Sequence, residues 1–180
     1  MNISKTSLLI PAIALCGAAL LPARAAQAQD TGLLPVRVKI GALLPTDSTT
    51  KDQAGDIIPA AELDVKIPRL FGGNTFASIG YQDRGGLRTV PLTISRTFGP
   101  KNPLKIVTGN PYFGLGAGVY FLNGDDGVGS SESKTTVGGF AQAGYQFPNP
   151  YFIEAKYQLV AQKADGLSAN GLLLFVGRRF

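Results

Sequence analysis

The sequence has no histidine and no tryptophan, and it has only one cysteine, Cys16, in 180 residues. The commonest general base and the commonest metal ligand are therefore both missing. Cys16 lies in the apolar N-terminal segment, so residues 29–180 carry no thiol nucleophile, no disulfide and no cysteine-bound metal. The sequence accordingly predicts no catalytic residue, no cofactor and no metal site.

The N-terminal segment is predicted to be a cleaved signal peptide, residues 1–28. Lys5 precedes a nearly unbroken apolar run over 8–21, and small residues then lead to Ala26-Gln27-Ala28, which fits a cleavage site. A lipoprotein signal at Cys16 is disfavoured by the leucine before it, and a retained anchor helix is disfavoured by two prolines in or beside the run. The mature chain is thus predicted to be one domain, residues 29–180.

Charge and long apolar runs are both scarce in this domain. Removing residues 1–28 deletes Lys5, Arg24 and no acid, which leaves 15 basic against 12 acidic residues, a formal charge of +3. That charge is too small to indicate a nucleic-acid partner. No apolar run after residue 28 reaches the ~20 residues of a spanning helix, so a membrane would have to be crossed by strands.

Period-two alternation dominates from residue 36 onward and predicts two-faced strands. In the clearest case Tyr151, Ile153 and Tyr157 alternate with Glu154 and Lys156. The same pattern predicts strands at 36–44, 60–67, 75–82, 88–98, 112–122, 135–147, 151–162 and 171–180. The fold class predicted is all-β, an eight-stranded antiparallel up-and-down β-barrel with no helix against the sheet, and Pro91 predicts a bulge or gap within it.

The predicted connections alternate between two kinds, as they do in outer-membrane barrels. The outer loops are predicted at 45–58, 83–87, 123–134 and 163–170, and the inner turns at 68–74, 99–111 and 148–150. Two outer loops, 45–58 and 123–134, are long and polar, whereas 148–150 is a short hairpin turn.

Alternation alone does not decide which face meets lipid, because a lipocalin-type soluble barrel has the same two faces in the opposite orientation. Aromatic residues on the apolar face gather near the strand ends, as membrane interfaces favour. Glycines crowd the polar face, where a narrow barrel needs small side chains. Arg96 is an exception, a charge on the apolar face, but it is near enough to an interface to reach water. The apolar face is therefore predicted to meet acyl chains.

Seven charged residues share the polar face and are predicted to line the interior. A lipid-facing lysine or arginine at the membrane midplane costs about 2–4 kcal/mol, so a register slip is strongly disfavoured. The pattern favours an ion-pair network that plugs the barrel over an open polar path, with the two basic residues of the first strand opposite the two acids of the second. The set is Arg37, Lys39, Glu62, Asp64, Lys66, Glu154 and Lys156.

The sequence resembles the small outer-membrane barrels of the OmpA/OmpW type, in its segments 40–45, 111–120, 152–157 and 175–180. The resemblance implies a porin-like transmembrane barrel in the outer membrane of a Gram-negative bacterium. It also implies that the barrel-assembly machinery reads the C-terminal strand through Phe180. Arg178 departs from the pattern, since an apolar residue is usual there.

The function expected is that of a non-enzymatic integral barrel in outer-membrane lipid, with a structural role or presentation of loops 45–58 and 123–134. Barrel enzymes that deacylate or acylate lipid A, and the omptin proteases, need a histidine; Ser78 and Ser95 are interpreted as space-filling. One alternative is a narrow channel for small or apolar solutes. The other is a secreted soluble lipocalin-like barrel that binds an apolar ligand.

Overall fold

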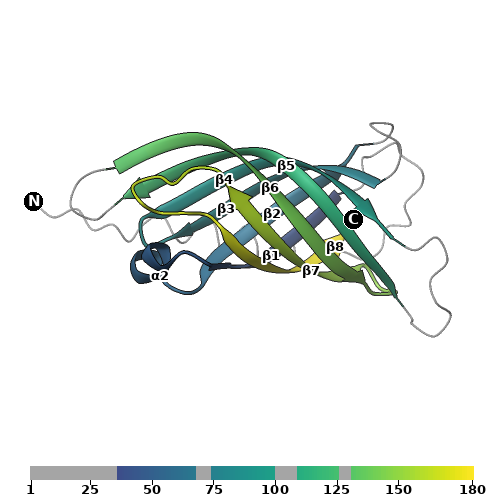
Figure 1. Ribbon diagram of the computed structural model, residues 1–180. Coiled ribbons are helices and arrows are strands. Elements are labelled where there is room, and N and C mark those ends of the chain that lie inside the picture. The colour runs from purple at the N-terminus through teal and green to yellow at the C-terminus, as the bar shows by residue number, and fades with distance from the viewer. Residues whose placement is uncertain (1–35, 68–73, 100–108, 126–130) are drawn as a thin grey trace, which may run out of the picture. The chain divides into compact units, whose positions relative to one another are not determined.

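A computed structural model describes residues 36–67, 74–99, 109–125 and 131–180, which form a closed antiparallel barrel of eight strands and one short helix (Figure 1). The predicted signal peptide, 1–28, lies outside the described residues. No helix among those residues is long and apolar enough to span a membrane. The elements are β1 (Val36–Pro45), α2 (Ser48–Ala54), β2 (Ile58–Lys66), β3 (Asn74–Arg84), β4 (Leu87–Phe98), β5 (Asn110–Asp125), β6 (Ser131–Gln146), β7 (Tyr151–Val160) and β8 (Gly171–Arg179).

Each strand pairs with the next one along the chain, and β1 closes the barrel on β8. This up-and-down order confirms the predicted fold class. Antiparallel register places Arg37 opposite Asp64 and Lys39 opposite Glu62. The pairing therefore brings residues of opposite charge together on one face of two adjacent strands, as the alternation predicts.

The β5–β6 hairpin is longer than predicted. The ladder continues through Asn123–Ser133 and ends at the pair Asp125–Ser131, inside the stretch that the sequence analysis assigned to the outer loop 123–134. The Asn123 side chain donates to the Ser133 hydroxyl at 3.1 Å, so polar side chains there stabilise the ladder. The loop prediction was wrong at both ends because polar residues and glycine do not prevent a strand that lies beyond the apolar band.

Helix α2 contradicts the prediction that 45–58 is wholly loop and that no helix contacts the sheet. The Asp47 carboxylate caps its N-terminus by accepting from the Thr50 amide at 3.1 Å. Gly55 ends the helix at φ 89°, where its N–H donates to the Lys51 carbonyl. Both signals are in the sequence, but seven residues are too few for a helical period to stand out.

Pro91 marks a local gap, not a bulge, in the β3–β4 ladder. Pairing stops after Ile79–Leu92 and resumes at Gln82–Thr89 in the same register. Proline has no N–H to donate, so the ladder loses bonds there while the register is kept. Of the two features predicted at Pro91, a bulge or a gap, the structure has the gap.

The orientation of the two faces agrees with the membrane interpretation. Leu92 and Ile153 are 43% and 46% exposed on the outside of the barrel. Glu62 and Lys156 are 6% and 2% exposed in its interior. A soluble barrel with an apolar interior requires the opposite arrangement.

Candidate functional site

The candidate site is a cluster of ionised side chains in the barrel interior, which we call the charged layer. It is built from β1, β2 and β7, whose inward positions follow the period of two. All six members are buried: Arg37, Lys39, Glu62, Asp64, Glu154 and Lys156.

Lys39 is the centre of the charged layer. Its ammonium lies 2.9 Å from a Glu154 oxygen and 3.2 Å from an Asp64 oxygen, and it also contacts Glu62 directly. Three carboxylates from two strands therefore share one cation, and two of those carboxylates lie 92 residues apart in the sequence. A buried charge is stable only when its partners are close and hydrogen-bonded, and Lys39 meets that condition.

The remaining pairs complete a balanced set of three cations and three anions. Arg37 Nη2 lies 2.7 Å from Asp64, and Lys156 binds both oxygens of Glu62. Tyr112, an inward residue of β5, donates its hydroxyl to the second Glu154 oxygen at 2.7 Å. The formal charges of these six residues therefore cancel within the layer.

Lys66 is the predicted member that does not join the charged layer. It is half-buried at the end of β2, and among the described residues it forms no ion pair. In sequence it alternates in step with Glu62 and Asp64, on which its predicted inward direction rests. Its position at the strand end, beyond the reach of the acids, follows from the register and could not be read from the face alone.

Aromatic rings lie against every cation of the charged layer. The Arg37 guanidinium lies 3.7 Å from the Phe76 ring centre, and the Lys156 ammonium lies 4.4 Å from that of Phe140. Lys39 lies 5.2 Å from the ring of Phe175. These distances are those of cation–π interactions, which offset part of the desolvation cost of a buried cation.

The interior glycines make room for these rings. A Cβ atom at Gly116 would collide with the Phe140 ring, and one at Gly144 would collide with the Tyr112 ring. These small residues were predicted from the narrowness of the barrel, and the structure shows that Gly116 and Gly144 make room for aromatic rings. The inward aromatic rings could have been found from the sequence. Phe152 and Phe140 alternate in step with the charged residues and glycines, not with the apolar face.

No protein-family model matches the sequence, and no curated protein matches it. Among solved structures, the chain is similar to the crystal structure of the N-terminal β-barrel domain of Pseudomonas aeruginosa OprF. The TM-score is 0.52 at 15% identity, over 81% of this chain and 97% of that one. The chain has the fold of an OmpA-type barrel.

In this OmpA-type barrel the interior changes character toward the end that carries α2. There, inward residues of β1, β2, β4 and β8 meet residues of α2 and of the segment 161–170 in what we call the apolar cap. In Figure 1, α2 and the segment between β7 and β8 lie at the same end of the barrel. The apolar cap consists of Leu43, Ala54, Ile58, Ala60, Leu87, Leu167, Leu173 and Phe175.

Specific polar contacts hold the two connecting segments over the apolar cap. The Ser168 amide donates to the Thr50 hydroxyl at 2.8 Å, and both residues are buried. At the surface, Lys163 forms an ion pair with Asp47. The hydrogen bond from Lys163 holds the pKa of the Asp47 carboxyl below its usual value, and bonds from Thr50 act in the same direction.

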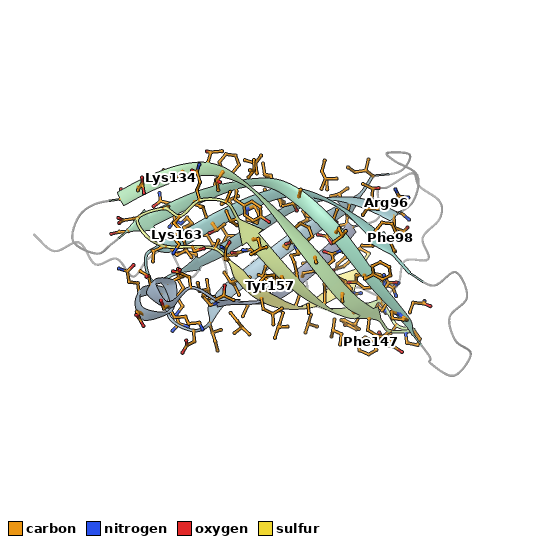
Figure 2. All side chains as sticks on the ribbon, in the orientation of Figure 1. Arg96, Phe98, Lys134, Phe147, Tyr157 and Lys163 are labelled. Atoms are coloured by element: carbon orange, nitrogen blue, oxygen red, sulfur yellow. The ribbon has the colours of Figure 1, made fainter. Side chains whose placement is uncertain are left out.

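The outward face of the barrel carries aromatic residues near the ends of its strands. Phe98 and Phe113 stack at 5.5 Å between ring centres, and Tyr145 meets Phe147 edge to face at 5.3 Å. In Figure 2, Phe98 and Phe147 lie at the end of the barrel opposite Lys134 and Lys163. These outward rings are where the sequence analysis placed them.

Phe180, the predicted assembly signal, follows β8 and is exposed. Its amide donates to the Val36 carbonyl at 2.9 Å, which extends the β1–β8 pairing by one bond. The guanidinium of Arg178 lies 4.9 Å from the Phe180 ring centre and 6.0 Å from that of Tyr151. Arg178, which stands where an apolar residue is usual in such barrels, thus lies against outward aromatic rings.

Proposed function

We propose that this protein is a non-enzymatic integral barrel of the outer membrane with a closed interior. Its role is structural, or it presents a rigid surface outside the cell. The observation that carries the proposal is the orientation of the strands. Large apolar side chains such as Phe113, Leu115 and Val137 are 61–64% exposed on the outside. Only a lipid environment makes such a continuous apolar exterior favourable around a charged interior.

The barrel ends support an orientation in the membrane. The strand ends bearing Phe98, Phe113 and Tyr151 fit one lipid–water interface. The other end carries α2 and the longer β5–β6 hairpin, as the surface side of such a barrel does. We therefore assign α2 and the hairpin to the cell surface and the aromatic-rich end to the periplasm.

A closed interior is favoured over the channel alternative. The ions of the charged layer have protein partners within 3.2 Å, and the apolar cap lies between them and the α2 end. An ion on this path would have to break a buried pair and then cross an apolar region, and each step is costly. The soluble alternative conflicts with the outward apolar face.

Two observations in cells test the membrane assignment. After fractionation the protein is expected in the outer membrane and released only by detergent. In cold detergent it is expected to migrate on a gel as a compact species, and to migrate differently after boiling. Protein released in buffer alone would contradict the proposal and favour the soluble ligand-binding alternative.

The closed interior has its own test. Purified protein in planar bilayers is expected to show no steady single-channel current. The paired variant Glu62→Gln/Lys156→Gln serves as the matched control. It removes one anion and one cation, so it weakens the charged layer without adding a net charge. Steady conductance of the unaltered protein would overturn the closed interior in favour of the channel.

Phe180 is proposed to be read by the barrel-assembly machinery. Its ring is exposed beside the last strand, so it is available to a partner before insertion. Phe180→Ala is expected to lower the amount of protein in the outer membrane, while Tyr157→Ala, also on the outward face, leaves it unchanged. Equal yields for both variants would contradict the assembly role.

A further inference from the structure

The outward face carries a hollow of about 500 Å³ over β2, β3, β4 and β5. It arises from the register, because Ala77 and Ala117 lie on either side of Ile94 in one cross-strand row. The next row contains the larger side chains Ile79, Leu92 and Val119, which form one wall. Two small residues beside large ones thus leave a depression in the outward face.

The chemistry of the hollow suits an alkyl chain. Its volume lies within the range of about 300–1,000 Å³ typical of ligand sites. The outward side chains that line it are all apolar, and the hydroxyls of Ser78 and Thr93 belong to inward positions. A polar solute would lose its hydrogen bonds there, whereas a lipid tail would lose none.

The two arginines on the outward face of β4 differ in their partners. Arg88, at the α2 end, forms an ion pair with Asp83 at 3.4 Å. Arg96, at the other end, lies 5.3 Å from the Phe98 ring centre, and no carboxylate among the described residues lies within ion-pair distance of it. Figure 2 shows Arg96 and Phe98 together at this end. Among the residues that the structure describes, Arg96 therefore has no acidic partner, and it lies at the end of the barrel proposed to meet a lipid–water interface.

We propose that the hollow and Arg96 together bind one glycerophospholipid of the periplasmic leaflet. One acyl chain occupies the hollow between Ala77 and Ala117, and the phosphate binds the Arg96 guanidinium. Guanidinium and phosphate form paired, charge-assisted hydrogen bonds, which a lysine or a neutral residue does not reproduce. The inference rests on the proposed function, since it requires the outward face to lie in a membrane.

The spacing allows one molecule to satisfy both parts of the site. Ile94 and Arg96 are two residues apart on one strand, or about 7 Å. The hollow therefore begins one pleat repeat deeper in the bilayer than the cation. The site thus combines a recess with a fixed charge at its mouth.

Native mass spectrometry of the full mature chain in detergent tests the proposal, with dipalmitoyl phosphatidylglycerol as the probe. One bound molecule is expected, and binding is expected to be about tenfold weaker in Arg96→Gln, which loses a charge-assisted bond. Ala117→Leu fills the hollow and is expected to weaken binding by a similar factor. The matched controls Arg88→Gln and Ala143→Leu, outward residues elsewhere on the barrel, are expected to bind like the unaltered chain.

Two further probes separate the parts of the ligand. Dipalmitoylglycerol lacks the phosphate and glycerol 3-phosphate lacks the tails, so each is expected to bind at least about tenfold more weakly than the phospholipid. Occupancy by detergent only, or equal loss in Arg96→Gln and Arg88→Gln, would overturn the inference. Either result contradicts the lipid site alone if the protein still fractionates with the outer membrane and every variant shows the cold-gel mobility shift. Release of the protein without detergent would contradict the proposed function as well.

Discussion

The charged layer and the apolar cap occupy the same barrel interior but are stabilised by opposite means. The charged layer depends on each ion having its partners, because an ion left alone in a buried site costs several kcal/mol. The apolar cap depends on volume, because an empty space there loses both transfer free energy and dispersion contacts. The comparison teaches that the interior of a narrow barrel can be filled by paired ions at one level and by apolar packing at another.

The sharpest way to break the charged layer is to remove its central cation. Lys39→Met leaves three carboxylates without their shared partner, so the free energy of unfolding is expected to fall by about 3–5 kcal/mol. Urea titration in detergent, read from the cold-gel mobility, measures this. The control Lys66→Met removes a charge outside the layer and is expected to change stability by less than about 0.5 kcal/mol.

The equivalent change in the apolar cap is Leu43→Ala. Loss of a fully buried leucine is expected to cost about 3 kcal/mol, within the range for such substitutions. The same titration measures it, with the outward Leu174→Ala as the control, expected to cost much less. A larger loss at Leu174 than at Leu43 would mean that the lipid face, not the apolar cap, stabilises this end.

A smaller and local effect is expected where the connecting segments meet. Thr50→Val removes the hydroxyl that accepts from the Ser168 amide and leaves that buried N–H unsatisfied, at about 1–3 kcal/mol. Hydrogen exchange of residues 48–54 and 161–170 is expected to accelerate while the strands stay protected. Thr49→Val, an exposed neighbour in α2, is the control, and uniform acceleration of all strands would show that the segments do not open separately.

The smallest expected effect concerns pH and the surface pair Asp47–Lys163. Folding lowers the pKa of Asp47, so the pair stabilises α2 above the unfolded carboxyl pKa of about 3.9 and that contribution is lost as pH falls through the folded value. The pair is exposed, so its contribution is below about 1 kcal/mol. Exchange protection of residues 48–54, corrected for intrinsic rates, is expected to drop below pH 4, and Lys163→Gln is expected to reduce that drop. An unchanged drop in Lys163→Gln would assign the pH dependence to another carboxyl.

Much of the charged layer could be predicted because strands alternate and adjacent strands are antiparallel. These two rules place Arg37 and Lys39 against Asp64 and Glu62 without any knowledge of rotamers. The contribution of β7 required the closure of the barrel, which brings Glu154 to Lys39 across 115 positions of sequence. Contacts across the interior depend on shear and side-chain length, which alternation does not report.

The apolar cap was missed for a different reason. Near the α2 end the inward residues become apolar too, as in the run Leu172-Leu173-Leu174, so the contrast between faces disappears. Leu173 is then marked as interior only by its place in the alternation, and its apolar side chain gives no further signal. Segment 163–170 was predicted as an outer loop, and nothing in its composition indicates that Leu167 is fully buried.

The most direct test of the account is the direction in which the strand residues face in a membrane. The only cysteine, Cys16, belongs to the predicted signal peptide, so in residues 29–180 a single cysteine introduced from Tyr151 to Val160 is the one site for a nitroxide label in lipid vesicles. Collision with oxygen, which concentrates in the bilayer, is expected to alternate with period two and to peak at Ile153, Ala155, Tyr157 and Leu159. Oxygen collision that peaks instead at Glu154, Lys156 and Gln158, or that is low throughout while a water-soluble nickel complex reaches the odd positions, would contradict the central claim.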